Sequence, residues 1–144
     1  MTAARRALAA LAVVLGLAAA PAAWAADLTV TVTGLADDSG NVHIALYDNP
    51  ATFPDGDGMM AKAEAPIRDR QALHVFRGLT PGRYAVAVYH DANDNDEFDQ
   101  GLLGIPLEDF AFSSGARAFL GPPGFEDAAV DVAGDTAISI PINQ

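Results

Sequence analysis

The chain of 144 residues has no cysteine, one tryptophan and one lysine, Lys62. Without cysteine the protein can form no disulfide bond, and a cysteine nucleophile is excluded. Eight basic residues stand against 19 acidic ones, so the formal net charge is −11. A surface this acidic repels nucleic acid and anionic lipid headgroups and attracts cations. The acidity therefore predicts either a cation-binding role or simply a charge that keeps the protein soluble.

Long apolar runs are also scarce, and the clearest one lies near the start of the chain. Arg5 and Arg6 precede a run rich in alanine, leucine and valine, and small residues come before Ala26. This order is typical of a secretory signal peptide. The run is short for a membrane anchor, which is the alternative, because a span needs about 20 residues. We therefore expect a signal peptide over residues 1–25, one domain without a membrane span over residues 26–144, and a periplasmic or secreted location.

Six segments of the remaining chain have the pattern of β-strands. They are residues 28–33, 42–47, 71–77, 84–90, 128–132 and 136–142. The first two alternate apolar and polar residues on either side of a short turn, which predicts a hairpin. The fourth is apolar on both faces, which predicts a central strand. Because Pro141 cannot donate a ladder hydrogen bond, we expect the last strand to lie at a sheet edge or to end early.

Three further features complete the predicted fold. Residues 59–64 are strong helix formers and predict a turn or two of helix. Tyr84 follows a Pro-Gly turn, as the structural tyrosine corner does in many β-sandwiches. Residues 101–125, rich in glycine, proline and phenylalanine, have no lasting period and are expected to fold over the sheet as a lid. Together these patterns predict an all-β fold, a single antiparallel β-sandwich of Ig-like or prealbumin-like type.

The most informative stretch follows the predicted central strand, where oxygen-bearing side chains recur at alternate positions. Asp91, Asn93 and Asn95 have the spacing of the first three ligands of an EF-hand-type loop. The Glu97 carbonyl and the Asp99 side chain match the next two positions. Because calcium takes roughly six to eight oxygen ligands, this stretch predicts a calcium site. Magnesium fits less well, since it prefers few protein ligands and rigid octahedral geometry.

Two departures separate this loop from an EF-hand. Asp96 stands where that motif has glycine, and Leu102 stands where a bidentate glutamate closes the shell. A strand rather than a helix is also expected before the loop. A remaining ligand must therefore come from elsewhere, and Glu108 or Asp109 in the predicted lid are the nearest candidates. The alternative is an acidic surface turn, because short Asp/Asn strings are common turn formers.

No complete catalytic constellation is present. The chain has neither a Gly-x-Ser-x-Gly elbow nor a His-Glu-x-x-His pair. His90 precedes Asp91, but adjacent strand residues face opposite ways, so we expect His90 to be structural or to orient the loop. The sequence thus predicts a non-enzymatic binding or structural module of the bacterial envelope, with a protein or glycan as its partner. The alternatives are a hydrolase or transition-metal protein using His90 and carboxylates of residues 99–109, or a zinc or copper protein using His43, His74 and His90.

Several motifs occur in a fixed order along the chain. They are Leu-Thr-Pro-Gly-Arg-Tyr-Ala-Val at residues 79–86, His-Asp-Ala-Asn-Asp-Asn at 90–95, Gly-Ile-Pro-Leu-Glu at 104–108, Phe-Ser at 112–113 and Gly-Pro-Pro-Gly-Phe-Glu-Asp-Ala at 121–128. In these motifs the chain resembles domain-of-unknown-function family 2141, a family of exported bacterial proteins. The resemblance covers nearly all of the chain after the predicted signal peptide. It implies an exported all-β domain that includes the acidic loop and the Gly-Pro-rich segment, and it implies no activity.

Overall fold

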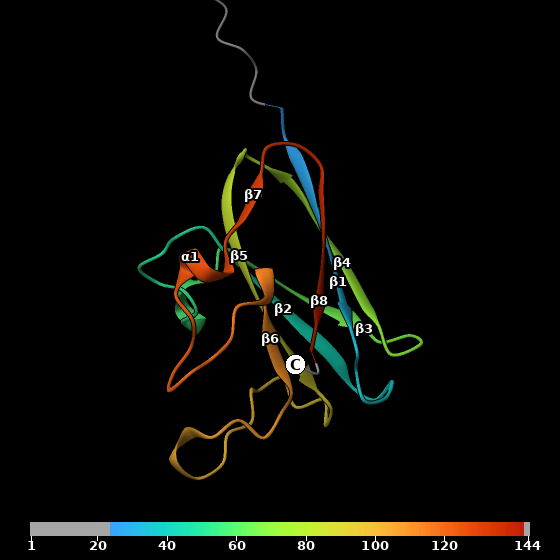
Figure 1. Cartoon of the computed structure of the whole chain (residues 1–144). Helices are drawn as coiled ribbons and strands as arrows, with labels where there is room; N and C mark the ends of the chain where they lie inside the picture. The colour runs from blue at the N-terminus through green and yellow to red at the C-terminus, as the bar shows by residue number, and fades with distance from the viewer. Residues whose placement is uncertain (1–23, 143–144) are drawn as a thin grey trace, which may run out of the picture.

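The computed structural model describes residues 24–142, which form two β-sheets packed face to face (Figure 1). The predicted all-β sandwich is therefore confirmed. The predicted signal peptide, apart from its last two residues, lies outside the described part of the chain. Between residues 24 and 142 there is no helix with the length and hydropathy that a membrane span requires.

The two sheets differ in size and are joined by connections that cross from one to the other. The smaller sheet has the order β4–β1–β8, with β1 at Ala26–Thr33, β4 at Ala72–Leu79 and β8 at Thr136–Pro141. The larger sheet has the order β3–β2–β5–β6, with β3 at Ala61–Pro66, β2 at Asn41–Tyr47, β5 at Gly82–Asp91 and β6 at Phe110–Phe112, and β7 at Val130–Val132 also pairs with β5. Neighbouring strands are antiparallel except for β1 and β8, which run parallel. That one pair departs from the purely antiparallel arrangement that the sequence predicts.

Apolar side chains from both sheets meet in a core between them. The strands β1 and β2 contribute six fully buried residues, Leu28, Val30, Val32, Val42, Ile44 and Leu46. The predicted hairpin of these two strands is wrong, because β1 and β2 belong to different sheets and face each other across the core. An alternating pattern shows which face of a strand is buried, but it does not show which strand lies beside it.

The prediction of a short helix over residues 59–64 is also wrong. β3 occupies most of this stretch and pairs antiparallel with β2, which places Glu64 opposite His43. A helix of this length gains too little from intrinsic propensity to compete with strand pairing.

The predictions for the central strand, the tyrosine corner and the last strand are confirmed. β5 is an interior strand of the larger sheet, as its two apolar faces predict. At its start the Tyr84 hydroxyl donates a hydrogen bond of 2.7 Å to the Thr80 carbonyl oxygen, which confirms the tyrosine corner. β8 is an edge strand that ends at Pro141, as predicted.

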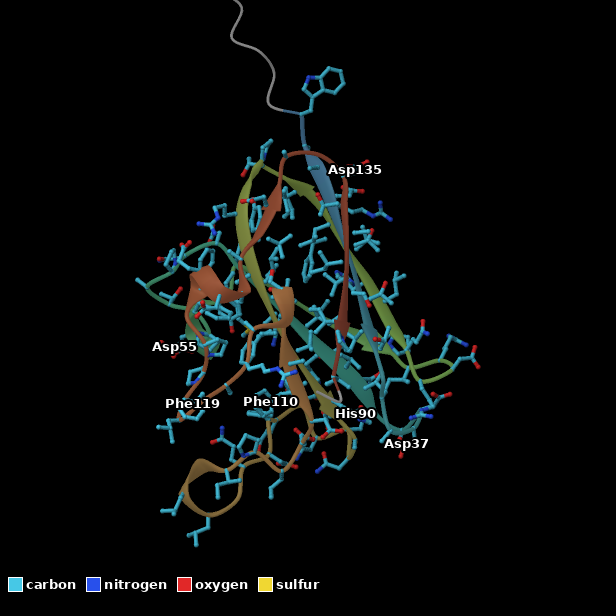
Figure 2. All side chains as sticks on the ribbon, in the orientation of Figure 1. Asp37, Asp55, His90, Phe110, Phe119 and Asp135 are labelled. Atoms are coloured by element: carbon cyan, nitrogen blue, oxygen red, sulfur yellow. The ribbon has the colours of Figure 1, made fainter. Side chains whose placement is uncertain are left out.

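Residues 101–125, the predicted lid, are divided into short pieces. Short 3₁₀ turns lie at Leu102–Gly104 and Ser113–Gly115, and the helix α1 begins at the end of the segment and covers Phe125–Ala128. A third 3₁₀ turn, Gly56–Gly58, lies between β2 and β3. Phe112 and Phe125 are buried with Tyr47 in a second apolar cluster, outside the core between the sheets. Phe119, in contrast, is 85% exposed on an outer loop (Figure 2). The segment therefore covers the larger sheet only in part.

Candidate cation site beside an aromatic groove

The acidic loop, residues 91–99, begins where β5 ends, so its first residue is held by a buried strand. Asp91 is fully buried, and both of its carboxylate oxygens accept hydrogen bonds from the loop backbone. The Asn95 N–H donates to Oδ1 over 3.1 Å, and the Asp96 N–H donates to Oδ2 over 2.8 Å. The loop turns back toward Asp91 because Asp94 and Asp96 take left-handed backbone conformations, with φ of 58° and 62°. Asp96 thus adopts the conformation that glycine provides at this position of an EF-hand.

These hydrogen bonds favour the charged form of the Asp91 side chain. Burial by itself raises the pKa of this carboxyl, but hydrogen bonds from the backbone of Asp96, Asn95 and Asp94 lower it more. The nearby imidazole of His43 adds a smaller lowering. The net pKa of Asp91 lies below its ordinary value of 3.8, so the side chain is an anion at neutral pH.

Two predicted ligands, Asn93 and Asn95, contact the carboxylate of a third, Asp99. Asn93 Nδ2 donates to Asp99 Oδ2 over 2.7 Å, and Asn95 Nδ2 donates to Asp99 Oδ1 over 3.1 Å. A half-turn of each carboxamide exchanges its nitrogen and oxygen, since the two ends are nearly identical in shape. Because Asn95 Oδ1 already accepts a backbone hydrogen bond, only Asn93 can make this exchange without losing one, so one carboxamide oxygen and the Asp99 carboxylate can converge on a cation here. The Glu97 N–H donates to Asn95 Oδ1 over 3.0 Å, which places the Glu97 backbone in the same turn.

Glu108 reaches this cluster from the segment that follows the loop. Its Oε2 accepts the Asp99 N–H over 3.1 Å, and the Leu107 N–H donates to the Asp99 carbonyl over 2.9 Å. Its other oxygen, Oε1, is buried and has no hydrogen-bond partner within residues 24–142. A buried carboxylate oxygen without a partner is destabilising, and a bound cation would relieve that cost. Of the two candidates for the missing ligand, Glu108 contacts the acidic loop, whereas Asp109 is exposed.

A second group of possible ligands lies on the outer face of the larger sheet. His43 on β2 is directly opposite Glu64 on β3 and Tyr89 on β5. One ligand atom from each of His43, Glu64 and Asp96 lies within 4.8 Å of the others. This group is not predicted from the sequence, because a helix over residues 59–64 would not place Glu64 opposite His43. Recognising that segment as a strand next to β2 would have been the signal that finds it.

The other two histidines do not join His43. His90 is 4% exposed on the opposite face of β5, and its Nε2 lies 2.8 Å from the Ser39 carbonyl oxygen. His74 is on β4 in the smaller sheet, where its ring packs edge-on against Phe76. Burial lowers the pKa of His74. Within the described part of the chain the three histidines therefore form no common site, and the His90 ring is engaged with the turn between β1 and β2.

An open groove of about 1220 Å³ runs along the outer face of the larger sheet, beside both groups. Its lining includes four aromatic rings in sequence, with centroids 5.2 Å apart for Tyr89 and Phe98, 5.9 Å for Phe98 and Phe110, and 5.8 Å for Phe110 and Phe112. Phe110 lies toward the lower end of the molecule in Figure 2. Burial, with Asp91 and other carboxylates nearby, raises the pKa of Tyr89 to about 12, so its phenol keeps the proton at neutral pH. The groove thus offers an apolar, aromatic surface with an anionic end.

Ser113, a buried hydroxyl next to the groove-lining strands, has a structural role. It accepts the Val86 N–H over 2.9 Å and donates to the Ala128 carbonyl oxygen. These contacts tie β5 to the end of α1, and they leave the hydroxyl engaged rather than exposed as a nucleophile.

Comparison with known proteins identifies a family but no characterised relative. The family model described as "Uncharacterized protein conserved in bacteria (DUF2141)" matches residues 30–140, which include the acidic loop, Glu108, His43 and Glu64. The family resemblance noted in the sequence is therefore confirmed. No curated protein and no solved structure matches the chain.

Proposed function

We propose that this chain, which belongs to the DUF2141 family, is a non-enzymatic binding module in which the acidic loop holds a calcium ion. The ion would stabilise one end of the aromatic groove, and the groove would receive the partner. The proposal places the protein in the bacterial periplasm or outside the cell, on the signal-peptide pattern of residues 1–25.

The observation that carries the calcium proposal is the buried, unpartnered Glu108 Oε1 within a cluster of oxygen donors. Glu108 contacts Asp99, and Asp99 is bonded to Asn93 and Asn95. All the predicted donors of this cluster are hard oxygens, which favour calcium or magnesium over transition metals. The irregular mixture of carboxylates and carboxamides on a loop favours calcium, because magnesium demands near-ideal octahedral geometry.

Calcium bound here would couple the acidic loop to the wall of the groove. Glu108 lies two residues before Phe110, the first residue of β6, and Phe98 lies next to Asp99 in the loop. An ion held by Asp99 and Glu108 would therefore fix Phe98 and Phe110, whose rings are in contact. Open grooves lined by aromatic rings suit partners with flat apolar faces, such as a peptide or a glycan.

Thermal unfolding of chelator-treated protein, with and without calcium, tests the ion. A loop of this kind is expected to bind with a Kd on the order of 10⁻⁴–10⁻³ M. Calcium at about 10 mM then stabilises the folded state by about 1.4–2.7 kcal/mol, since it binds the folded state alone. For a domain of this size that corresponds to a rise in Tm of about 5–10 °C.

Three variants separate a site from a general charge effect. Glu108→Gln and Asp99→Asn should lose most of the calcium-dependent rise in Tm. Asp109→Asn removes the same charge one residue away from an exposed position and should keep the rise. A wild-type Tm that does not respond to calcium, or an equal response in Glu108→Gln, would contradict the calcium site.

The partner is tested separately with glycan arrays and peptide libraries probed in calcium and in chelator. We expect binding that requires the groove and weakens in chelator. If neither the glycan arrays nor the peptide libraries show binding at high protein concentration, the result would count against a binding module. It would not contradict the calcium site, which is tested separately.

A further inference from the structure

We propose that His43, Glu64 and Asp96 form a second cation site, which takes a divalent first-row transition metal such as zinc. The site lies at the anionic end of the groove and shares no ligand with the proposed calcium set, because Asp96 is not a member of that set. It also differs from a three-histidine site, since His74 and His90 lie elsewhere.

The sheet places two of the ligands and the acidic loop places the third. Glu64 and His43 are directly opposite each other on β3 and β2, so their side chains emerge from the same face. Asp96 is brought over this face by its own left-handed turn and by the hydrogen bond from its N–H to Asp91 Oδ2, 2.8 Å long. Asp91, anchored at the end of β5, therefore positions the third ligand.

The His43 ring is held in a defined orientation, and its Nε2 lies among carboxylate oxygens. It stacks on Tyr89 with centroids 4.6 Å apart and an angle of 4° between the ring planes. Nε2 is buried and makes no hydrogen bond of acceptable geometry within residues 24–142, although Asp91 Oδ2 is only 3.3 Å away. A nitrogen lone pair beside carboxylate oxygens is unfavourable, so Nε2 carries either a proton, as in its ion pair with Asp91 Oδ2, or a metal ion. A metal ion would satisfy Nε2 and the carboxylates together.

The distances fit a small transition metal. Ligands about 2.1 Å from a tetrahedral zinc ion are ~3.4 Å from one another. His43 Nε2 and Asp96 Oδ1 are 3.7 Å apart, and all three ligand atoms lie within 4.8 Å of one another. Glu64 is exposed on an edge strand, so its side chain is free to close the remaining gap.

The three donor atoms favour one class of metal and leave one coordination position open. An imidazole nitrogen with two carboxylates suits zinc and its neighbours, whereas calcium prefers oxygen alone. Three protein ligands leave a coordination position open, as in catalytic rather than structural zinc sites. His43, Glu64 and Asp96 all line the groove, so that open position faces the space where a groove ligand would lie. An oxygen or nitrogen donor of the bound partner could then complete the shell.

Calorimetric titration of zinc into the full chain, with excess calcium present, tests the site. We expect one zinc ion per chain, and we expect His43→Ala and Glu64→Gln each to weaken its affinity more than about tenfold, because even the partners of metal ligands contribute about 10–100-fold. His74→Ala removes a histidine from the other sheet and should leave zinc affinity unchanged. X-ray absorption of the zinc complex should show one nitrogen among oxygen neighbours.

Two results would overturn the proposal. One is zinc affinity in Glu64→Gln equal to that of the wild type; this variant changes an exposed residue, so its fold, checked by circular dichroism, is not at risk. The other is displacement of zinc by calcium, which would assign the zinc signal to the acidic loop. A zinc site that persists when Glu108→Gln has abolished the calcium response would support the second site independently of the first.

Discussion

Replacing Asp91 with asparagine removes the charge at the point where the acidic loop joins β5. The wild-type carboxylate is fully buried and accepts backbone hydrogen bonds at both oxygens, from Asn95 and Asp96. In Asp91→Asn one oxygen becomes an NH₂ group that faces a donor, and the other bond loses its charge. Hydrogen bonds to charged groups contribute about 1.5–3 kcal/mol each, so we expect the free energy of unfolding to fall by about 2–4 kcal/mol.

Urea unfolding at neutral pH in the presence of a chelator measures this loss without any contribution from calcium. The urea midpoint should fall while the slope stays the same, because the folded state keeps its compactness. Asp94→Asn is the matched control, since Asp94 is an exposed aspartate of the same loop and accepts its hydrogen bond from the half-buried Asn41 side chain. We expect it to change stability by less than about 1 kcal/mol.

The same pair of proteins gives a pH test. The pKa of Asp91 is lowered in the folded state, so its contribution is fully present above the unfolded pKa of about 3.9 and is lost as the pH falls through the folded value. The stability difference between wild type and Asp91→Asn should therefore be constant from neutral pH to about pH 5 and shrink below about pH 4. A loss under about 0.5 kcal/mol at neutral pH, or a difference that persists unchanged in acid, would refute the assigned role.

Three further substitutions, one of them with a matched control, test the framework by urea unfolding. Gly40→Ala would place a Cβ 1.8 Å from the Asp91 carbonyl oxygen at φ +62°, and should lower the free energy of unfolding by on the order of 3 kcal/mol or more. The control Gly78→Ala, at φ +70° in open space, should lower it by only about 1–2 kcal/mol. Equal losses of stability in the two variants would disprove the clash. Ser113→Ala leaves two buried backbone groups unpaired and should cost about 1–3 kcal/mol, whereas a neutral result would mean that water replaces the hydroxyl. Tyr84→Phe loses the hydrogen bond to the Thr80 carbonyl oxygen and the longer contact with the Thr80 hydroxyl, and should cost about 1 kcal/mol; unchanged stability would mean that the tyrosine corner does not stabilise the fold.

The sequence predicts best the strands whose buried and exposed faces can be read from the order of apolar and polar residues. β1 and β2 alternate because one face of each meets the core, and β5 is apolar on both faces because it is covered on both. Their partners could not be predicted in this way, because alternation says nothing about neighbours. The parallel contact of β1 with β8 joins residues 108 apart, such as Leu28 and Thr136, and no local pattern reports a contact over that separation in the chain.

The same distinction applies to the candidate sites: residues close in the chain could be grouped from the sequence, and residues brought together by strand pairing could not. Asn93, Asn95 and Asp99 meet because they belong to one tight turn, so their spacing was enough to group them. Glu108 was named as a nearby ligand, and it does contact Asp99. His43 was named as a possible ligand together with His74 and His90, but its grouping with Glu64 was missed, because that contact depends on the register of β3 and residues 59–64 were expected to form a helix.

The parallel pairing of β1 and β8 has a mechanical consequence. The register runs from Leu28 beside Thr136 to Thr33 beside Pro141, so the start of β1 and the end of β8 lie at opposite ends of the pair (Figure 1). Tension applied between residues 26 and 141 would pull these strands lengthwise past each other and load their hydrogen bonds together. An antiparallel pair held at adjacent ends would instead peel apart one bond at a time. We therefore expect the domain to resist stretching along β1 and β8, and the force needed to open it should depend strongly on the direction of pull.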